Sequence, residues 1–287
     1  MKIGCNALYP RGILAQSSLF TVQATREALT KLAQAGYQAV EYSHAGHFNL
    51  DEAHRVREHA ESIGIESWSV HAEGVGGFTL GNTAAEAQAC LMHCLDVCAA
   101  LGGKVVVVHA PFGIGLKLPD AGAVQETADR DRRVLAPAGA RALDLGIEVA
   151  LENGGELVHM EYILRLCDLL DMPSVGICVD TGHAHLGDLG APRAVRMAGE
   201  RLYTTHLQDN LGQRDDHMPP GQGTIDWPAL FAALAQVGYS RTLMLELTDR
   251  AEHRPYDQDL ELEQGARNMG RFAARYLALF GQDEAPS

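Results

Sequence analysis

Residues of types that commonly bind metal ions stand at the ends of six successive candidate strands. The valine run 105–108 is followed by His109, and the run 149–151 is followed by Glu152. One polar residue at the end of a buried strand is ordinary, because solvent begins there. The same few residue types at the ends of successive runs instead predict one shared polar site. The residues are His71, His109, Glu152, Asp180, His206 and Glu246.

Four of these residues make an oxygen-rich donor set of three carboxylates and one imidazole: Glu152, Asp180, His206 and Glu246. Such a set suits Mn²⁺, Mg²⁺ or Co²⁺ better than a structural zinc site, which is rich in thiolates. We therefore expect one exchangeable divalent cation, with Mn²⁺ first and Mg²⁺, Co²⁺ or Zn²⁺ as alternatives.

Further polar residues lie close to these in the sequence. His183 follows Asp180 by three residues, and Asp215 and His217 stand in the polar stretch after His206. They can act as hydrogen-bond partners of metal ligands, as substrate ligands or as further metal ligands, and spacing does not separate these roles. We assign a substrate-binding role to His71, His109, His183, Asp215, His217 and Phe112.

The elements that must position these residues alternate along the chain. Short β-type runs are separated by longer amphipathic stretches, a pattern typical of a parallel sheet with crossover helices. We expect strands at residues 2–6, 38–42, 66–71, 104–109, 147–152, 175–180, 202–206 and 242–246. We expect helices at residues 25–34, 50–63, 84–101, 129–145, 162–170, 228–237 and 260–279. Glycines, which often end helices, stand just before five strands: Gly36, Gly64, Gly102, Gly146 and Gly238.

These units predict an α/β fold, a single (β/α)8 TIM barrel over residues 1–280, with a disordered C-terminal tail at 281–287. Such barrels typically occupy about 250 residues. An open doubly wound sheet is the alternative, but no G-x-G-x-x-G motif follows the first strand to support dinucleotide binding. In a barrel the carboxyl ends of all strands share one rim, where the metal-competent residues would meet.

Three other residues near the expected rim allow two interpretations each. Phe112 forms an apolar wall against a sugar or closes the top of the barrel. Glu41 faces the pocket or forms a structural salt bridge. Trp227, which follows a polar stretch, is expected to pack at a helix start rather than to stack on substrate.

Composition and charge exclude several classes of protein. The chain is 46% hydrophobic and 21% charged, as expected of a protein able to bury a large core. Its net charge of -14 argues against nucleic acid and anionic membrane as partners. We find no secretory signal and no run of about 18 apolar residues, and we expect a cytoplasmic protein with reduced cysteines. Cys90, Cys94 and Cys98 share a helix face and are interpreted as core.

Three segments carry a recognisable pattern: residues 176–183 (Gly-Ile-Cys-Val-Asp-Thr-Gly-His), 206–209 (His-Leu-Gln-Asp) and 215–227 (Asp-Asp-His-Met-Pro-Pro-Gly-Gln-Gly-Thr-Ile-Asp-Trp). The pattern resembles the xylose isomerase-like superfamily, within it the sugar epimerases, the inosose isomerases and dehydratases, and the hydroxypyruvate isomerases. The resemblance implies that Glu152 and Glu246 transfer protons and that His183 contacts substrate. It also implies one divalent cation held by Glu152, Asp180, His206 and Glu246.

The expected function is therefore that of a divalent-metal-dependent isomerase or epimerase. Its substrate would be a ketose, a related keto-sugar or a keto-inositol, and the proton next to the carbonyl would leave through a metal-stabilised enediolate. Dehydration by β-elimination in the same site is the alternative. The expected partner is a small sugar or cyclitol, and a homo-oligomer is a family expectation.

A rival function is that of the trinuclear-zinc apurinic-site endonucleases, which share the fold. Their nine ligand positions can all be filled here. Against a nuclease, Gln208 and its neighbours lack the asparagine and lysine expected after the strand-seven histidine, and Gly182 replaces a small side chain. The net charge of -14 also disfavours DNA binding. A non-catalytic sugar-binding barrel is the third hypothesis, and the retention of Glu152 and Glu246 argues against it.

Overall fold

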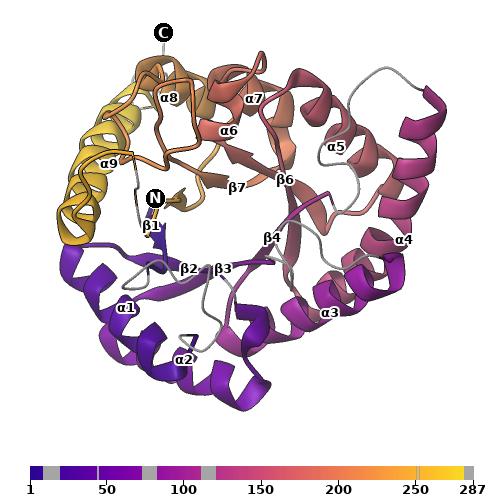
Figure 1. The fold of residues 1–287 in the computed structure, drawn as a ribbon, viewed down its shortest axis with the longest axis horizontal. Helices are drawn as coiled ribbons and strands as arrows, with labels where there is room; N and C mark the ends of the chain where they lie inside the picture. The colour runs from indigo at the N-terminus through magenta and orange to yellow at the C-terminus, as the bar shows by residue number, and fades with distance from the viewer. Residues whose placement is uncertain are drawn as a thin grey trace, which may run out of the picture.

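A ring of parallel strands forms the centre of the molecule. The computed structural model describes residues 1–8, 20–43, 45–72, 83–110, 121–249, 251 and 253–280. One eight-stranded sheet has the order β7-β6-β5-β4-β3-β2-β1-β8, and the helices surround it (Figure 1). The strands are β1 (Ile3–Asn6), β2 (Ala39–Ser43), β3 (Glu66–His71), β4 (Val105–His109), β5 (Glu148–Glu152), β6 (Val175–Asp180), β7 (Leu202–His206) and β8 (Leu243–Leu245).

The last contact in the ring joins β7 to β8. Leu207 and Leu245 form a parallel bridge, and the Leu207 N–H donates to the Met244 carbonyl at 2.8 Å. The predicted (β/α)8 barrel is thus confirmed. Phe112 and the predicted tail at 281–287 lie outside the described residues.

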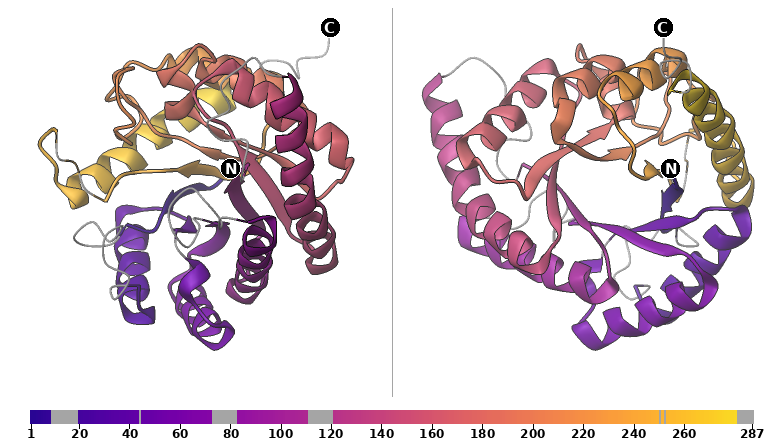
Figure 2. Two further views of the ribbon diagram at one scale, coloured as in Figure 1. Left: turned by 45° about the vertical axis from the view of Figure 1, so that its right-hand side comes forward. Right: turned by 180° about the vertical axis from the view of Figure 1, so that it is seen from behind.

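The helices form the outer layer, as both further views show (Figure 2). They are α1 (Val22–Ala35), α2 (Leu50–Ile63), α3 (Ala84–Leu101), α4 (Ala121–Leu145), α5 (Leu157–Leu170), α6 (Thr181–Leu186), α7 (Ala191–Ala198), α8 (Trp227–Gln236) and α9 (Gln258–Phe280). The described residues also include the short 3₁₀ helices η3 (Ala45–His47) and η4 (Gly199–Arg201). Three of the helix-ending glycines adopt left-handed φ angles of 96°, 73° and 77°, namely Gly36, Gly64 and Gly102.

The sequence prediction missed α6 and α7, which both lie between β6 and β7. They have only six and eight residues, too few to show a clear amphipathic period. The predicted helices 129–145 and 162–170 also began too late, since α4 starts at Ala121 and α5 at Leu157.

Side-chain alternation along the strands separates two hydrophobic layers. One layer lies between strands and helices and includes Val106, Val108 and Leu151. The other fills the lower barrel and consists of Ala39, Trp68, Val105, Val107, Ala150, Cys178 and Met244. Because strand side chains repeat every two residues, the next inward position on five of these strands is polar. Those positions are Glu41, His109, Glu152, Asp180 and Glu246.

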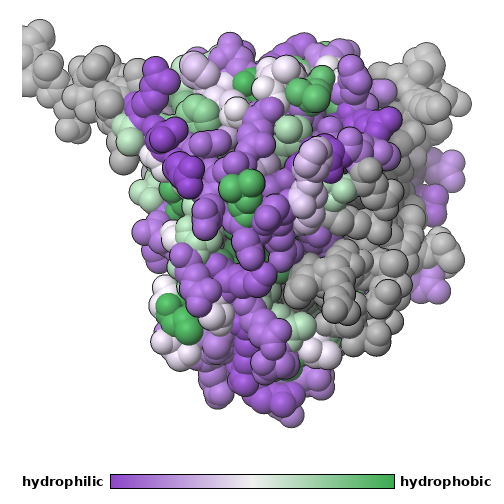
Figure 3. All heavy atoms as spheres, turned by 60° about the vertical axis from the view of Figure 1, so that its left-hand side comes forward, coloured by the Kyte–Doolittle hydropathy of each residue, from purple (hydrophilic) through white to green (hydrophobic). Residues whose placement is uncertain are grey.

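By length and composition alone, helix α3 is long and apolar enough to cross a membrane. In the barrel it packs between α2 and α4, so its apolar side chains are used in helix packing. Cys94 and Cys98 are buried there, which confirms their interpretation as core residues. The described part of the face in Figure 3 is mainly hydrophilic, with hydrophobic residues standing singly.

Candidate active site

The four predicted metal ligands meet above the barrel core. One potential ligand atom from each lies within 4.8 Å of the other three, and all four residues are buried: Glu152, Asp180, His206 and Glu246. Three carboxylates in so small a buried volume repel one another. Burial raises the pKa of Asp180 to about 8, and Glu246 Oε2 is buried without a hydrogen-bond donor among the described residues. The donor set therefore fits a divalent cation, which would offset this charge.

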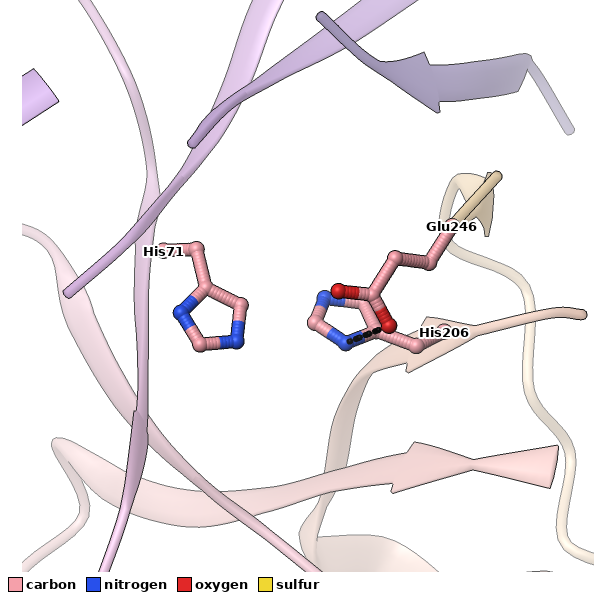
Figure 4. A group of neighbouring side chains, drawn as sticks. All are labelled: His71, His206 and Glu246. Atoms are coloured by element: carbon pink, nitrogen blue, oxygen red, sulfur yellow. Dashed lines mark ion pairs between the residues drawn. The ribbon is translucent and has the colours of Figure 1, made fainter. Parts of the chain in front are cut away.

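His206 stands between two sets of carboxylates. Its Nδ1 lies 3.1 Å from Glu152 Oε1 and 3.3 Å from Glu246 Oε2, and Figure 4 shows the His206–Glu246 pair facing His71. Its Nε2 lies 3.0 Å from Glu41 Oε1. Nδ1 therefore faces Glu152 and Glu246, and Nε2 faces Glu41.

Two further histidines, His71 and His109, approach Oε2 of Glu152. Nε2 of His71 lies 3.0 Å from Glu152 Oε2, and Nε2 of His109 lies 3.3 Å from the same oxygen. Burial lowers the pKa of His109 to about 4, so its ring is neutral at physiological pH. The three side chains form a second potential cation-binding group.

A third group gathers around Asp215. Asp215 Oδ2 lies 3.1 Å from His183 Nε2 and 3.0 Å from His217 Nε2. Burial opposes a charge on His217, but the charges of Glu246 and Asp215 raise its pKa to about 10. His217 also has a left-handed φ of 44°, a conformation that costs a non-glycine residue about 1 kcal/mol or more. The structure thus brings together every described residue of the predicted site.

The loop that carries Asp215 and His217 is organised by Asp209, which is fully buried. Oδ1 of Asp209 accepts hydrogen bonds from the backbone N–H groups of Asn210 and Ile225 at 3.0 and 3.2 Å. Its Oδ2 accepts from the Gly221 N–H at 2.9 Å and from Trp227 Nε1 at 2.8 Å. These bonds fold residues 209–227 back onto the rim.

Trp227→Phe is expected to lower the free energy of unfolding by about 1–3 kcal/mol, because a buried carboxylate loses one donor. Trp227 lies at the start of α8 and is 3% exposed, as the sequence predicted. Denaturant unfolding measures the loss. Trp68→Phe is the matched control, since Trp68 Nε1 donates at 3.0 Å to the neutral Thr204 hydroxyl. An equal or larger loss in the control variant would contradict a special role for Asp209.

Asn153 ties β5 to β6 beneath the site. Its Nδ2 donates to the Asp180 carbonyl at 3.0 Å, and its Oδ1 accepts from the Asp180 N–H at 2.8 Å. Asp180 in turn is the N-cap of α6, where its Oδ1 accepts from the His183 N–H at 2.6 Å. The cap fixes the three-residue spacing that places His183 beside Asp180.

Gly182 and Gln208 are explained by one contact. A Cβ at position 182 would lie 2.1 Å from the end of the Gln208 side chain, so any larger residue there would displace Gln208. Gln208 Nε2 donates to Asp215 Oδ1 at 2.7 Å and lies 3.4 Å from both Asp180 oxygens. Gly182 and Gln208, the two positions that depart from the nuclease pattern, therefore pack against each other.

Sequence reasoning did not assign Asn153 or Gln208 to the site. Both are amides within polar stretches, and composition gives no signal for them. Glu41 carried a signal, since it is a charged residue inside the strand Ala-Val-Glu-Tyr-Ser. It faces the site and also forms an ion pair, so its two interpretations are both true.

Comparisons with known proteins found several distant relatives. L-ribulose 3-epimerase of Methylomonas sp. is 27% identical over 254 residues, which cover 81% of this chain and 82% of that protein. Inosose isomerase of Bacillus subtilis is 25% identical over 163 residues, covering 53% and 57%. A probable endonuclease 4 of Mycobacterium leprae is 28% identical over 160 residues, covering 52% and 60%. The chain spans about half the length of two uncharacterised relatives, 51% in Sinorhizobium fredii and 55% in Methanocaldococcus jannaschii.

Solved structures share the whole fold. A D-tagatose 3-epimerase-like protein superposes with a TM-score of 0.73 at 22% identity, covering 99% of this chain and 100% of that one. A family model described as xylose isomerase-like TIM barrel matches residues 29–269. The chain belongs to the xylose isomerase-like TIM barrel family.

Proposed function

We propose that the protein is a divalent-cation-dependent isomerase or epimerase of a ketose, a related keto-sugar or a keto-inositol. The observation that carries the proposal is the convergence of two carboxylates from distant strands. Glu152 ends β5 and Glu246 follows β8, and their oxygens lie 3.1 and 3.3 Å from the same His206 nitrogen. The epimerase and inosose isomerase relatives support the same class of reaction.

The two glutamates supply the proton transfers in this proposal. Burial opposes ionisation of Glu152 and Glu246, but nearby histidines hold both pKa values below the usual range. Both are therefore carboxylates at neutral pH and can accept a proton from the carbon next to the substrate carbonyl. Return of a proton to the opposite face of that carbon gives an epimer, and return to the neighbouring carbon gives an isomer.

A bound divalent cation would polarise the substrate carbonyl and hydroxyl oxygens as a Lewis acid. Glu152, Asp180, His206 and Glu246 would hold it, and the three carboxylates favour Mn²⁺, Mg²⁺ or Co²⁺, with Zn²⁺ as a further alternative. His183 and His217 stand beside this set and would bind substrate hydroxyl groups. The proposal includes a cytoplasmic location, which the six free cysteines support, and a homo-oligomeric state.

Cation binding is expected to tighten as the pH rises through about 8. In the cation-free site burial raises the pKa of Asp180 to about 8. Burial opposes the charge on His206, but neighbouring Cys178 and Glu41 raise its pKa well above the usual value. Both groups therefore hold protons at pH 7, and a cation must displace them. Calorimetric titration in buffers of different ionisation enthalpy measures the protons released. An affinity that stays constant from pH 9 to pH 6 would contradict this expectation.

The substrate class is tested with a panel of ketoses and inososes. The metal-reconstituted protein is incubated with each compound, and products are separated by chromatography and identified by NMR. The proposal predicts an epimer or isomer of at least one compound. A product that has lost water would instead identify the dehydratase, and no conversion of any compound would count against the proposal.

A second candidate function is that of a multi-zinc nuclease. The specific observation in its favour is that two further potential cation-binding groups adjoin the four predicted metal ligands. One consists of His71, His109 and Glu152, and the other of His183, Asp215 and His217. The net charge of -14 disfavours binding to a DNA backbone. Elemental analysis separates the two functions, because a nuclease of this kind would contain about three zinc ions per chain and cleave abasic DNA.

A further inference from the structure

Glu41 is a fully buried carboxylate with an inward position on β2. Its oxygens lie 3.0 and 3.1 Å from His206 Nε2. The Ser69 hydroxyl donates to Glu41 Oε2 at 2.7 Å. Glu41 is thus held from β3 and directed at a single nitrogen of His206.

The opposite nitrogen of His206 faces the proposed cation site. A neutral imidazole carries one proton, and the nitrogen without it offers the lone pair that a cation needs. Nδ1 is the nitrogen close to Glu152 and Glu246, so Nδ1 must be the one without a proton. The proton must then reside on Nε2, where a carboxylate acceptor is already in place.

Glu41 is not placed to bind the same cation itself. Among the described residues, the groups whose ligand atoms lie within 4.8 Å of one another do not include it. The His206 ring lies between Glu41 and the other carboxylates. Glu41 can therefore affect the cation site only through its contact with His206.

The geometry points to Glu41 as a positioning residue that holds His206 in the Nε2–H tautomer and aims Nδ1 at a divalent cation. The inference rests on the proposed function, because it requires a cation at His206. Carboxylate partners of ligating histidines fix ring orientation and raise ligand basicity, and their removal typically costs about 10- to 100-fold in metal affinity. Glu41→Ala is expected to weaken Mn²⁺ binding by such a factor.

The test compares Mn²⁺ affinity, measured by titration with electron paramagnetic resonance, in wild-type protein and three variants. Glu41→Ala removes the acceptor, whereas Glu41→Gln keeps one oxygen acceptor and should lose less than about tenfold. Glu66→Gln is the matched control, since Glu66 also lies in the barrel wall but pairs with Lys2 at 2.9 Å, away from the site. The control should bind Mn²⁺ as the wild type does.

A spectroscopic readout separates positioning from a merely structural role. In protein labelled with ¹⁵N-histidine and loaded with diamagnetic Mg²⁺, one ring should show a protonated Nε2 and an unprotonated Nδ1. That signal should be missing from a His206→Asn sample, which assigns it. In Glu41→Ala it should shift towards a mixture of tautomers. If Glu41→Ala does not fold, the same measurements on Glu41→Gln and Ser69→Ala decide.

Unchanged Mn²⁺ affinity and an unchanged His206 signal in the folded Glu41 variants would overturn the inference while leaving the proposed function intact. Wild-type protein that binds no divalent cation would overturn both together. Weaker Mn²⁺ binding with an altered His206 signal, and with a normal Glu66→Gln control, is the result that the geometry predicts.

Discussion

Glu246→Gln is expected to lower kcat by about 100- to 10,000-fold, the usual contribution of one proton-transfer group. Glu246 is 7% exposed, and its Oε2 lies 3.3 Å from His206 Nδ1 and 3.6 Å from His217 Nδ1. The amide has the same shape but cannot accept a proton from substrate. Because it also removes a buried negative charge close to Glu152, the cation-free variant should unfold cooperatively near the wild-type midpoint. Steady-state kinetics on the identified substrate and thermal unfolding measure the two effects.

The matched control is Glu148→Gln, a change in the same class of side chain at the start of β5. Glu148 pairs with Arg241 at 2.9 Å at the opposite end of the barrel, so turnover should persist. Wild-type rates in Glu246→Gln would contradict the assignment of Glu246 to proton transfer. Equal losses in both variants would show that the effect comes from the fold.

Removal of the cation should have the second large effect. A chelator is expected to abolish turnover, because the histidines beside Glu152 and Glu246 cannot polarise the carbonyl and hydroxyl oxygens of a substrate as a divalent cation would. At a cation concentration of 100 times Kd, the bound ion should add about 2.7 kcal/mol of stability, or about 5–10 °C in Tm. Calorimetry of chelated and Mn²⁺-reloaded protein measures the shift. Full turnover after complete removal of metal would contradict the cation requirement.

Asp180→Asn tests whether Asp180 is one of the cation ligands. The amide keeps a hydrogen-bond acceptor for the His183 N–H and so keeps the N-cap of α6. It loses a charged ligand, so the stabilisation by Mn²⁺ should shrink while the chelated variant remains folded. A Mn²⁺-induced shift as large as that of the wild type would remove Asp180 from the ligand set.

Much of the fold was predictable because its signals are local. β3, β6 and β7 have the predicted bounds, and each ends at a polar residue, namely His71, Asp180 and His206. α6 and α7 were not predictable in the same way. α7 begins after Gly190 and has Pro192 in its first turn, and eight residues hold too few turns for a period to appear.

The convergence of these side chains was also predictable, because strand ends in a closed barrel must meet. The pairing of individual atoms was not. Glu152 directs Oε1 towards His206 and Oε2 towards His71, a division set by barrel register rather than by sequence spacing. The contact between Gly182 and Gln208 joins α6 to the segment after β7 and is equally absent from any local pattern.

Solvent-deuterium exchange tests the central claim most directly. The Mn²⁺-loaded protein is incubated in deuterated water with the ketose or inosose panel, with Glu246→Gln and chelated protein in parallel. The proposed function predicts deuterium at a carbon next to the carbonyl, in wild-type protein only and with about one cation per chain. No exchange into any compound, together with about three zinc ions per chain, would contradict proton transfer and favour the nuclease.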